Sequence, residues 1–527
     1  MHRVAAIICV VALGTLAARA AEPLPKSANA SSARVSPDWA ECARLLASAP
    51  PEIELTVCRV EGDAARVLVS NAIPFPREVL FDARNIVIRK DGREIPISAR
   101  EIVKWPDSRS IRSVLVQFNC DLGSAKQDTV VLGFGALRST VDLPLAPVTW
   151  TLPAAIAVPS KEWMSYSGVL GAMVPAGYSV ATPAGIVDNM AYDANFLAQY
   201  TRYESFGGGD QGVVEGTNYY DNTHSLYQQF LRTGNVDYYK LARRWAVYHR
   251  TRQIAPLESR WPGRRTLDGT TITRYTYVEG LVDDYLLNGD QASLAVAGVV
   301  VDQFYMKLEE LAGGGVYYKP PRKRGFWTER EPAFALLGIV CYYEATLKPA
   351  YRQEAERIVH ELHRMQVENQ AIDGQTGFIH NLYDHDPQEG AKRDNWGGST
   401  WMTGLLLEGV IRYHIISRDP AAAESVTMAV DWLTRFGRVG TSDSWVYFTA
   451  PSRAGRPYYD LNQMITHAYA YAYRLSGYSN AEYFTLGLGG YNAGIAKAHL
   501  ADQKHLNQNY RSSPNFLGYL AKVDQMR

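Results

Sequence analysis

The side chains that could do chemistry are concentrated in five short stretches of the second half of the chain, each just ahead of a run with helical periodicity. In these stretches aromatic rings stand beside carboxylate, guanidinium and amide groups. Such groups suit sugar binding, because the apolar face of a sugar stacks on Tyr or Trp while polar groups hydrogen-bond to its hydroxyls. The candidate substrate-binding residues are Tyr219, Asp221, Tyr277, Glu279, Arg324, Trp327, Arg330, Asp394, Trp396, Tyr458, Tyr459, Asp460, Gln463 and His467.

The same stretches hold groups that suit β-elimination on a uronate-containing glycan. A lyase must remove the weakly acidic proton next to the uronate carboxylate, so it needs a base and a cation or proton donor that neutralises the carboxylate. Tyr or His can be the base, and a neighbouring Arg lowers the pKa of a tyrosine. The candidate catalytic residues are Tyr220, His224, Arg274, Tyr275 and Glu329.

Two other interpretations stay open. A glycoside hydrolase would use two carboxylates, about 5–5.5 Å apart for retention of configuration or about 6.5–9.5 Å apart for inversion. The carboxylates available for this are Asp221, Glu279, Glu329, Glu331, Asp394 and Asp460. A non-catalytic glycan-binding protein would use the same rings without turnover. Single residues could also be structural, since the aspartates could be helix N-caps and His224 and His467 could be buried polar groups.

The elements that must position these residues are helices joined by alternating short and long connections. Short turns at Gly234, Gly289, Pro349, Asp419 and Gly477 each end one amphipathic helix and begin the next, with a period of roughly 60 residues. Helical hairpins at a fixed period form a ring or an open stack. We expect an α/α toroid, with an open α-solenoid as the alternative, and residues 188–203 could supply part of a sixth hairpin.

The long connections are residues 205–218, 256–273, 317–328, 375–399 and 440–457. In a ring of hairpins, all connections of one class lie on one rim. Loops longer than about 12–15 residues without structure of their own are usually functional. The sequence therefore predicts a cleft where these loops meet, beside helix N-termini whose dipoles favour anions.

The first half of the chain has the two-residue alternation of β-strands instead, and Asp91-Gly92 between two such runs is a hairpin signal. The fold class is therefore α+β multidomain, with a β barrel- or sandwich-like domain before the helical toroid. The predicted organisation is a signal peptide (1–20), an N-terminal segment (21–50), the β domain (51–150), a linker with the first toroid elements (151–217) and the catalytic toroid (218–527).

Three stretches of the β half carry a resemblance to a known family. They are Ser70-Asn-Ala-Ile-Pro-Phe-Pro-Arg-Glu-Val-Leu, Arg89-Lys-Asp-Gly-Arg-Glu-Ile-Pro-Ile and Lys104-Trp-Pro-Asp-Ser-Arg-Ser-Ile-Arg-Ser-Val-Leu-Val. This half resembles the N-terminal β domain of rhamnogalacturonan exolyase-type proteins, although the family usually has Gly-Ser where this chain has Ser108-Arg109. The helical half resembles α/α toroid carbohydrate-active enzymes in general. The resemblance implies a secreted polysaccharide-active enzyme and transfers no catalytic residue.

Composition excludes several classes of protein. The chain has 527 residues, of which 46% are hydrophobic and 20% charged, so it is neither disordered nor collagen-like. Its 54 Lys+Arg balance 54 Asp+Glu, which gives no reason to expect nucleic acid or an acidic membrane surface as partner. The 33 Tyr and 11 Trp outnumber 15 Phe, an excess that suits either an aromatic-lined groove or half-buried helix faces. We expect a polysaccharide or oligosaccharide as the partner.

The N-terminus has the pattern of a secretory signal. His2 and Arg3 precede an apolar run, and Ala18-Arg19-Ala20 has the small-x-small pattern of a cleavage site. We expect cleavage after Ala20 and a periplasmic or secreted protein with no membrane segment in the mature chain.

Export allows disulfides, and Cys42 with Cys58 is the pair expected from proximity in sequence, whereas Cys341 is expected to be a buried thiol. We expect no cofactor and no metal. A calcium ion could still bridge a uronate to Asp384 or Asp386, although nothing in the sequence demands it.

Overall fold

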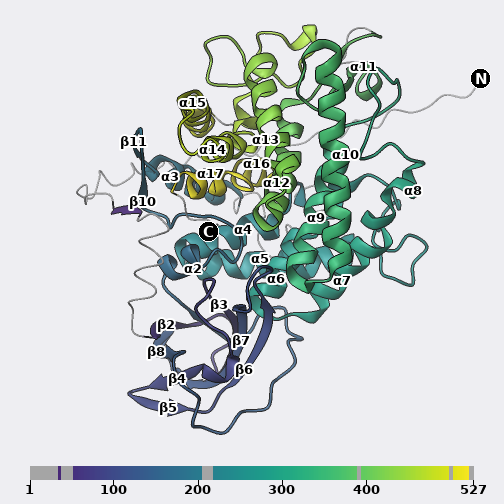
Figure 1. Cartoon of the computed structure of the whole chain (residues 1–527). Coiled ribbons are helices and arrows are strands. Elements are labelled where there is room, and N and C mark those ends of the chain that lie inside the picture. The colour runs from purple at the N-terminus through teal and green to yellow at the C-terminus, as the bar shows by residue number, and fades with distance from the viewer. Residues whose placement is uncertain (1–33, 37–50, 204–217, 388–392, 498–502, 522–527) are drawn as a thin grey trace, which may run out of the picture.

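The computed structural model of the chain has a large helical domain packed on a smaller N-terminal β domain (Figure 1). The structure describes residues 34–36, 51–203, 218–387, 393–497 and 503–521. Within these ranges, no helix has both the length and the apolar character needed to cross a lipid bilayer. The predicted signal peptide lies outside the described residues.

The β domain is a single curled sheet with the strand order β5-β4-β8-β2-β9-β3-β7-β6. Its strands are β2 (Glu52–Arg59), β3 (Arg66–Pro74), β4 (Val87–Lys90), β5 (Arg93–Ile95), β6 (Ser98–Lys104), β7 (Ile111–Asp121), β8 (Gln127–Gly133) and β9 (Ala155–Val158). The end strands β5 and β6 are not paired with each other, so the sheet is open and the predicted barrel or sandwich is not confirmed. Strand β9 lies beyond residue 150 and pairs with β2 and β3, so the sheet extends past the predicted domain boundary.

Local sequence explains the hairpin between β4 and β5. Asp91 and Gly92 both have positive φ, at 51° and 75°, and the strands pair directly on either side, with Lys90 opposite Arg93. Positive φ at both central residues matches the right-handed twist of paired strands, which is why an Asp-Gly pair favours this turn. The predicted hairpin is confirmed.

The helical domain consists mainly of helix pairs joined by short turns. Its helices are α2 (Lys161–Ser167), α3 (Met190–Tyr203), α4 (Asn222–Thr233), α5 (Val236–Tyr248), α6 (Glu279–Asn288), α7 (Gln291–Gln303), α8 (Leu308–Ala312), α9 (Arg330–Thr346), α10 (Pro349–Asp373), α11 (Leu382–His385), α12 (Thr400–Ser417), α13 (Pro420–Trp432), α14 (Thr466–Leu475), α15 (Ala481–Lys497), α16 (Gln503–Tyr510) and α17 (Ser513–Leu520). The pairs α4/α5, α6/α7, α9/α10, α12/α13 and α14/α15 are the five predicted hairpins. At the first two turns Gly234 and Gly289 end their helices with φ of 73° and 68°, a backbone conformation that glycine adopts without strain.

The first helix of each pair packs beside the first helix of the next pair, so α4, α6, α9, α12 and α14 form an inner layer. The C-terminal segment closes this layer, because Asn507 Nδ2 donates to the Tyr219 carbonyl at 2.8 Å and Arg511 donates to the Tyr220 carbonyl at 3.2 Å. Helix α3 packs against α16 and supplies the expected extra helix. The closed ring confirms the α/α toroid over the open solenoid.

Two small sheets complete the described structure. Strand β1 (Arg34–Ser36) pairs with β10 (Tyr178–Thr182), which also pairs with β11 (Gly185–Val187). Strands β12 (His380–Asn381) and β13 (Trp396–Gly397) form a short antiparallel pair in the long connection before α12.

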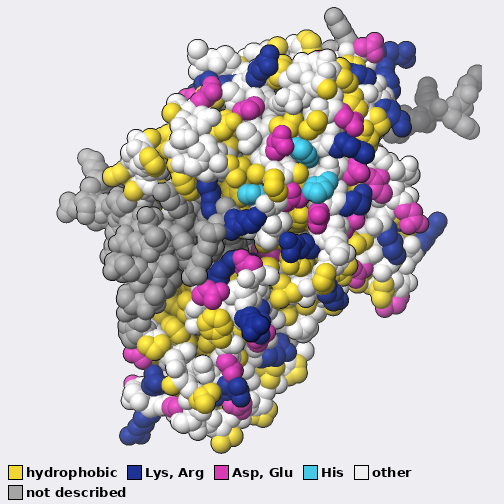
Figure 2. All heavy atoms as spheres, in the orientation of Figure 1, with side chains coloured by type: hydrophobic (Ala, Val, Ile, Leu, Met, Phe, Trp, Pro, Cys, Tyr) yellow, Lys and Arg dark blue, Asp and Glu magenta, His cyan; other side chains and the backbone are white. Residues whose placement is uncertain are grey.

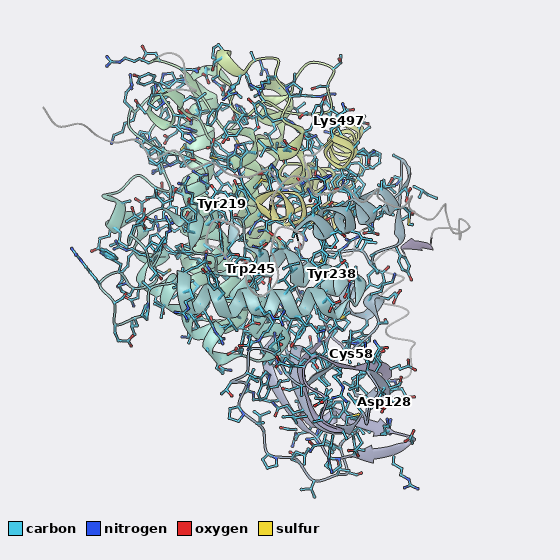
Figure 3. All side chains as sticks on the ribbon, turned by 180° about the vertical axis from the view of Figure 1, so that it is seen from behind. Cys58, Asp128, Tyr219, Tyr238, Trp245 and Lys497 are labelled. Atoms are coloured by element: carbon cyan, nitrogen blue, oxygen red, sulfur yellow. The ribbon has the colours of Figure 1, made fainter. Side chains whose placement is uncertain are left out.

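The β domain packs against the short-turn end of the ring. Ser113 on β7 donates to the Leu286 carbonyl at 2.6 Å, and the Tyr285 hydroxyl donates to the Ile102 carbonyl at 3.1 Å. Seen from behind, Cys58 marks the β domain at one end of the molecule and Tyr219 lies well away from it in the helical domain (Figure 3). The long connections therefore open at the end of the ring that the β domain leaves uncovered.

The cysteines of the described residues are thiols. Cys58 and Cys341 are both buried and free, so the Cys341 prediction is confirmed. Cys58 is a free thiol whose sulfur lies in the sheet within reach of Gln127 on β8, and Cys42, its predicted partner, lies outside the described residues.

Candidate active site

Four of the five long connections meet at one rim of the ring. Thr273, ahead of α6, donates its backbone N–H to Glu331 of α9 at 2.8 Å. Glu329 accepts from the backbone N–H of Ser399, ahead of α12, at 2.7 Å. Ser399 in turn forms a β-bridge with Phe448 in the connection before α14. The predicted convergence is confirmed for these connections, whereas most of residues 205–218 lie outside the described residues.

A continuous line of aromatic rings crosses this rim, and we call it the aromatic row. It consists of Tyr275, Tyr219, Tyr220, Trp401, Tyr447 and Tyr458. Consecutive ring centroids are between 4.3 and 6.1 Å apart. The row links the starts of α4, α6, α12 and α14, so it depends on the closed ring and not on any one helix.

Cationic side chains lie over four of these six rings. They are Arg265 and Arg274 over Tyr275, Lys504 over Tyr219, Arg330 over Trp401, and Arg453 and Arg456 over Tyr458, at 4.4 to 5.8 Å from the ring centroids. Arg330 also donates a hydrogen bond to the Tyr219 hydroxyl at 3.0 Å. Cations over aromatic faces are held in place by the ring quadrupole without losing their charge. The rim can therefore bind an anionic, ring-shaped substrate.

The backbone that presents Tyr219 is held by its neighbours. Tyr220 and Asp221 have φ of 71° and 69°, a left-handed conformation that is costly for bulky residues and that clusters at functional sites. The Tyr277 hydroxyl accepts from the Tyr220 N–H at 2.9 Å. Asp221 caps α4 by accepting from the His224 N–H and also accepts from the Gly280 N–H at 2.8 Å. Asp221 and Tyr277 are thus supports of the rim, and the N-cap interpretation of Asp221 is confirmed.

Glu329 and Trp327, two predicted site residues, both contact His380, which the sequence did not single out. Glu329 is fully buried, and burial raises its pKa to about 8. Its Oε1 lies 3.7 Å from the His380 ring, which in turn contacts the Trp327 ring at a centroid distance of 5.2 Å. Trp327 is itself buried and donates to the Val316 carbonyl, so it packs rather than stacks on substrate.

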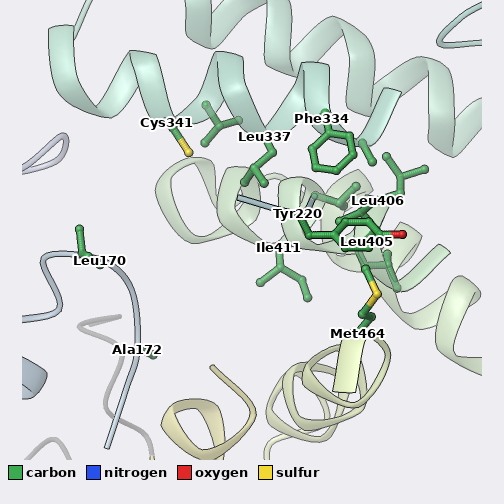
Figure 4. Close-up of a cluster of buried hydrophobic side chains, with 14 of the residues drawn as sticks. Leu170, Ala172, Tyr220, Phe334, Leu337, Cys341, Leu405, Leu406, Ile411 and Met464 are labelled. Atoms are coloured by element: carbon green, nitrogen blue, oxygen red, sulfur yellow. The ribbon is translucent and has the colours of Figure 1, made fainter. Parts of the chain in front are cut away.

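Three other predicted residues face the inside of the ring. His224, Glu279 and His467 line a cavity of about 90 Å³ that we call the chamber. It is bounded on one side by Leu170, and Figure 4 shows Leu170 facing Leu337 across the ring. The prediction that these three residues lie on the rim is wrong, because they start the inner helices and their side chains turn inward.

The chamber wall carries a chain of buried ion pairs. Glu279 accepts from Arg412 at 2.5 Å and from Arg511 at 2.6 Å. Each arginine binds a second carboxylate at 2.8 Å: Arg412 binds Glu344 and Arg511 binds Glu408. All five side chains are largely or fully buried, and Arg112, which donates to Glu344 at 3.2 Å, supplies a third cation for the three carboxylates.

His224 joins this network through two carboxylates. Its Nδ1 lies 2.6 Å from Asp283, and its Nε2 lies 3.7 Å from Glu279. Burial alone would lower the pKa of His224, but the charges of Glu279 and Asp283 outweigh burial and raise it. Burial lowers the pKa of His467 to about 3, so this imidazole is neutral. His224 is thus held between two carboxylates inside the ring and does not face the rim.

The remaining predicted residues are dispersed around the rim. Arg324 is exposed and binds Asp384 through two nitrogens, at 2.6 and 3.0 Å, and lies 3.7 Å from Asp394. Trp396 is half-buried on β13 under Arg322. Asp384, one of the two residues considered for a calcium bridge, is therefore engaged by an arginine.

Near α14, Tyr459 is half-buried under Lys497, whose Nζ lies 4.2 Å from the ring centroid. Asp460 is half-buried, and its backbone carbonyl accepts from Gln508 at 2.5 Å. Gln463 is buried and donates to the Tyr491 carbonyl at 3.0 Å, which makes it a packing residue.

The sequence did not single out several residues of the rim. Tyr447 and Arg453 lie in a long connection that was predicted to be functional, and Trp401 lies at a predicted helix start. Their positions in the sequence could therefore have identified these three residues. Lys504 and Arg511 lie in the C-terminal segment, where no local pattern distinguishes them. Only closure of the ring brings them to the site.

No family model and no curated protein matches the chain. Among solved structures, an unsaturated glucuronyl hydrolase specific for heparin is 11% identical, with a TM-score of 0.46 over 63% of this chain and 98% of that chain. An unsaturated glucuronyl hydrolase from Bacillus sp. GL1 is 14% identical, with a TM-score of 0.44 over 64% of this chain and 94% of that chain. A polysaccharide lyase is 11% identical, with a TM-score of 0.43 over 63% of this chain and 97% of that chain.

These similarities do not assign a function to this chain. None of the three proteins is described as a rhamnogalacturonan exolyase, so the resemblance of the β half stays a prediction.

Proposed function

We propose that the protein is a polysaccharide lyase that cleaves a uronate-containing glycan by β-elimination at the aromatic row. The observation that carries this proposal is the row itself, in which cations lie over the rings of Tyr275, Tyr219, Trp401 and Tyr458. The half-buried rings of Tyr275, Tyr219 and Tyr458 offer stacking surfaces for sugars, and the cations over them select sugars that carry carboxylates. A chain with zero formal net charge has concentrated positive groups here.

Tyr219 is the residue we assign as the base. Its hydroxyl accepts a hydrogen bond from Arg330 at 3.0 Å, which fixes the position of the oxygen on the rim. The Tyr219 oxygen would take the proton from C5 of the uronate, and the electron pair of that C–H bond would form the C4=C5 double bond. The bond from C4 to the glycosidic oxygen would break at the same time.

Two further roles fall to Arg274 and Tyr275. The guanidinium of the half-buried Arg274 lies 4.9 Å over the Tyr275 ring and would bind the uronate carboxylate there. Tyr275 lies next to Tyr219 in the row, with 5.7 Å between ring centroids. Its hydroxyl would donate the proton that the departing glycosidic oxygen needs, which balances the proton taken by Tyr219.

Hydrolysis receives less support from the same rim. It needs a pair of carboxylates, one of them free to donate a proton and the other to activate water or attack. Among the predicted carboxylates, Asp221 binds two backbone N–H groups, Glu331 binds Thr273, and Glu279 binds two arginines inside the ring. The tyrosines and arginines are better placed than these three for chemistry on a bound sugar.

The proposal extends to where the enzyme works. A polysaccharide is met outside the cytoplasm, and the pattern that ends at Ala20 is that of an export signal. We therefore infer action in the periplasm or outside the cell.

Incubation of the purified protein with uronate-containing glycans tests the reaction. β-Elimination produces an unsaturated uronate, which absorbs in the ultraviolet, together with one new reducing end per cleavage. We expect the two signals to rise in equal amounts. New reducing ends without the absorbance would overturn elimination in favour of hydrolysis. Binding without either signal would make the protein a glycan-binding protein.

The variant Tyr219→Phe tests the assigned base. General acid–base catalysis contributes about 10²- to 10⁴-fold to a rate, so kcat should fall by that factor. Tyr318→Phe is the matched control, because Tyr318 is also half-buried under an arginine, Arg364, but its hydroxyl donates to Glu368 on α10. Tyr219→Phe with the activity of Tyr318→Phe would show that another group is the base.

A further inference from the structure

Glu329, His380 and His385 place three potential metal ligands together at the rim. One ligand atom from each residue can be chosen so that all three lie within 4.8 Å of one another. Glu329 comes directly before α9, His380 lies on β12 and His385 ends α11, so three separate pieces of chain supply the group. Glu329 and His380 are fully buried, and His385 is half-buried.

The orientation of the two imidazoles favours ligation. His380 Nδ1 lies 3.3 Å from the Phe378 carbonyl, and a hydrogen bond there leaves the lone pair of Nε2 for a metal. His380 Nε2 and His385 Nδ1 lie 3.0 Å apart and share a hydrogen bond, which an ion bound to both nitrogens would replace. A backbone carbonyl that fixes the tautomer in this way is the usual outer partner of a histidine ligand.

The carboxylate supplies the second, independent observation. Glu329 Oε1 accepts from the Ser399 N–H at 2.7 Å, but Oε2 is buried and has no hydrogen-bond partner among the described residues. A buried polar atom without a partner costs about 1–3 kcal/mol, so it calls for an explanation. A cation bound between Oε2 and the two imidazoles satisfies it.

The surroundings are aromatic rather than acidic. The ring of Trp327 lies 5.2 Å from that of His380, and the rings of Phe326 and Phe448 lie 5.9 and 5.0 Å from that of His385. Calcium and magnesium prefer sites built from oxygen ligands, whereas two imidazoles and one carboxylate suit Zn²⁺.

We propose that Glu329, His380 and His385 bind one Zn²⁺ ion. Three protein ligands would leave one tetrahedral position open, as in catalytic rather than structural zinc sites. Solvent reaches the group on the side of the half-buried His385. The site adjoins Arg330 in sequence, but zinc binding does not depend on the proposed lyase reaction, and either can fail without the other.

Calorimetric titration of the untagged, chelator-treated full-length protein with ZnCl₂ tests the site. We expect one high-affinity site per chain. Glu329→Gln and His385→Asn should each weaken binding at least 10-fold, whereas His363→Asn should not, because His363 faces Glu424 on the outer surface. Cobalt replacing zinc should give the visible absorption bands of four-coordinate Co²⁺, and both ligand variants should lose them.

Two results would overturn the proposal. One is a wild-type protein that takes up no zinc. The other is equal affinity in wild type, Glu329→Gln and His385→Asn, which would place any bound zinc elsewhere. Circular dichroism of each variant shows whether it is folded. If Glu329→Gln does not fold, the half-buried His385→Asn decides the question by itself.

Discussion

Replacing Glu279 by glutamine should destabilise the helical domain more than any change on its surface. Glu279 is 5% exposed and accepts hydrogen bonds from Arg412 and Arg511. The glutamine keeps the shape of the side chain but removes its charge. The buried guanidinium groups of Arg412 and Arg511 then lose the carboxylate that both of them bind. His224 also loses one of the two negative charges that raise its pKa.

The structure sets the size of the effect. Removing one partner of a buried ion pair costs about 3–5 kcal/mol, because the other charge stays buried without compensation. Here each arginine keeps a second carboxylate at 2.8 Å, so the lower end applies and we expect about 3 kcal/mol. At about 2 °C per kcal/mol for a large domain, the midpoint of thermal unfolding should fall by about 6 °C.

Glu424→Gln is the matched control, because Glu424 is paired with a histidine but its side chain is 63% exposed. Exposed pairs contribute about 0–1 kcal/mol, so this variant should melt close to wild type. Differential scanning calorimetry of both variants at one scan rate makes the comparison. If Glu279→Gln and Glu424→Gln have the same midpoint of thermal unfolding, the buried ion pairs do not stabilise the ring. The double variant with Glu408→Gln should lose more than the sum of the two single changes, since both carboxylates bind Arg511.

Two further predictions concern other parts of the ring. Tyr277→Phe removes the acceptor of the Tyr220 N–H, which should lower the free energy of unfolding in urea by about 1–3 kcal/mol. It should also lower activity, because the aromatic row is displaced. Stability equal to that of Tyr318→Phe would contradict this prediction. The pKa of His467 is about 3 in the folded protein and 6.5 in the unfolded chain. Below pH 6.5 only the unfolded chain therefore takes up a proton at this residue, so the free energy of unfolding falls as the pH falls. Between pH 6 and 4 the wild type should therefore lose about 1.4 kcal/mol per pH unit more than His467→Gln, and parallel pH profiles for the two proteins would refute the assignment.

The sequence predicts the helical ring well because its signals are local. Turns at Gly234 and Gly289 fall where the structure ends α4 and α6, since a glycine with positive φ ends a helix wherever it occurs. The long connections were also found by their length alone. The convergence of these connections followed from the geometry of a ring, and the contact between Ser399 and Phe448 confirms it.

The functional groups were harder to predict because their environment is set by distant segments. Glu279 and His224 begin inner helices just after the rim, and one turn of helix decides whether a side chain points at substrate or into the ring. Arg511 reaches Glu279 across 232 positions of sequence. His380 and His385 are close in sequence, but they form a possible metal site only because the fold brings Glu329 to them from an earlier segment. Local patterns cannot encode such pairings.

The contrast between the chamber and the rim decides where an anionic sugar can bind. In the chamber every arginine that contacts Glu279 also holds another carboxylate, so a uronate would have to break a buried ion pair to enter. On the rim, Arg274 and Arg330 lie over neutral rings and form no ion pair with the described carboxylates. A cation held by a ring keeps its charge available, since the ring compensates it only through a quadrupole. An incoming carboxylate would therefore gain a new ion pair at the rim, whereas at Arg412 or Arg511 it would only exchange one ion pair for another.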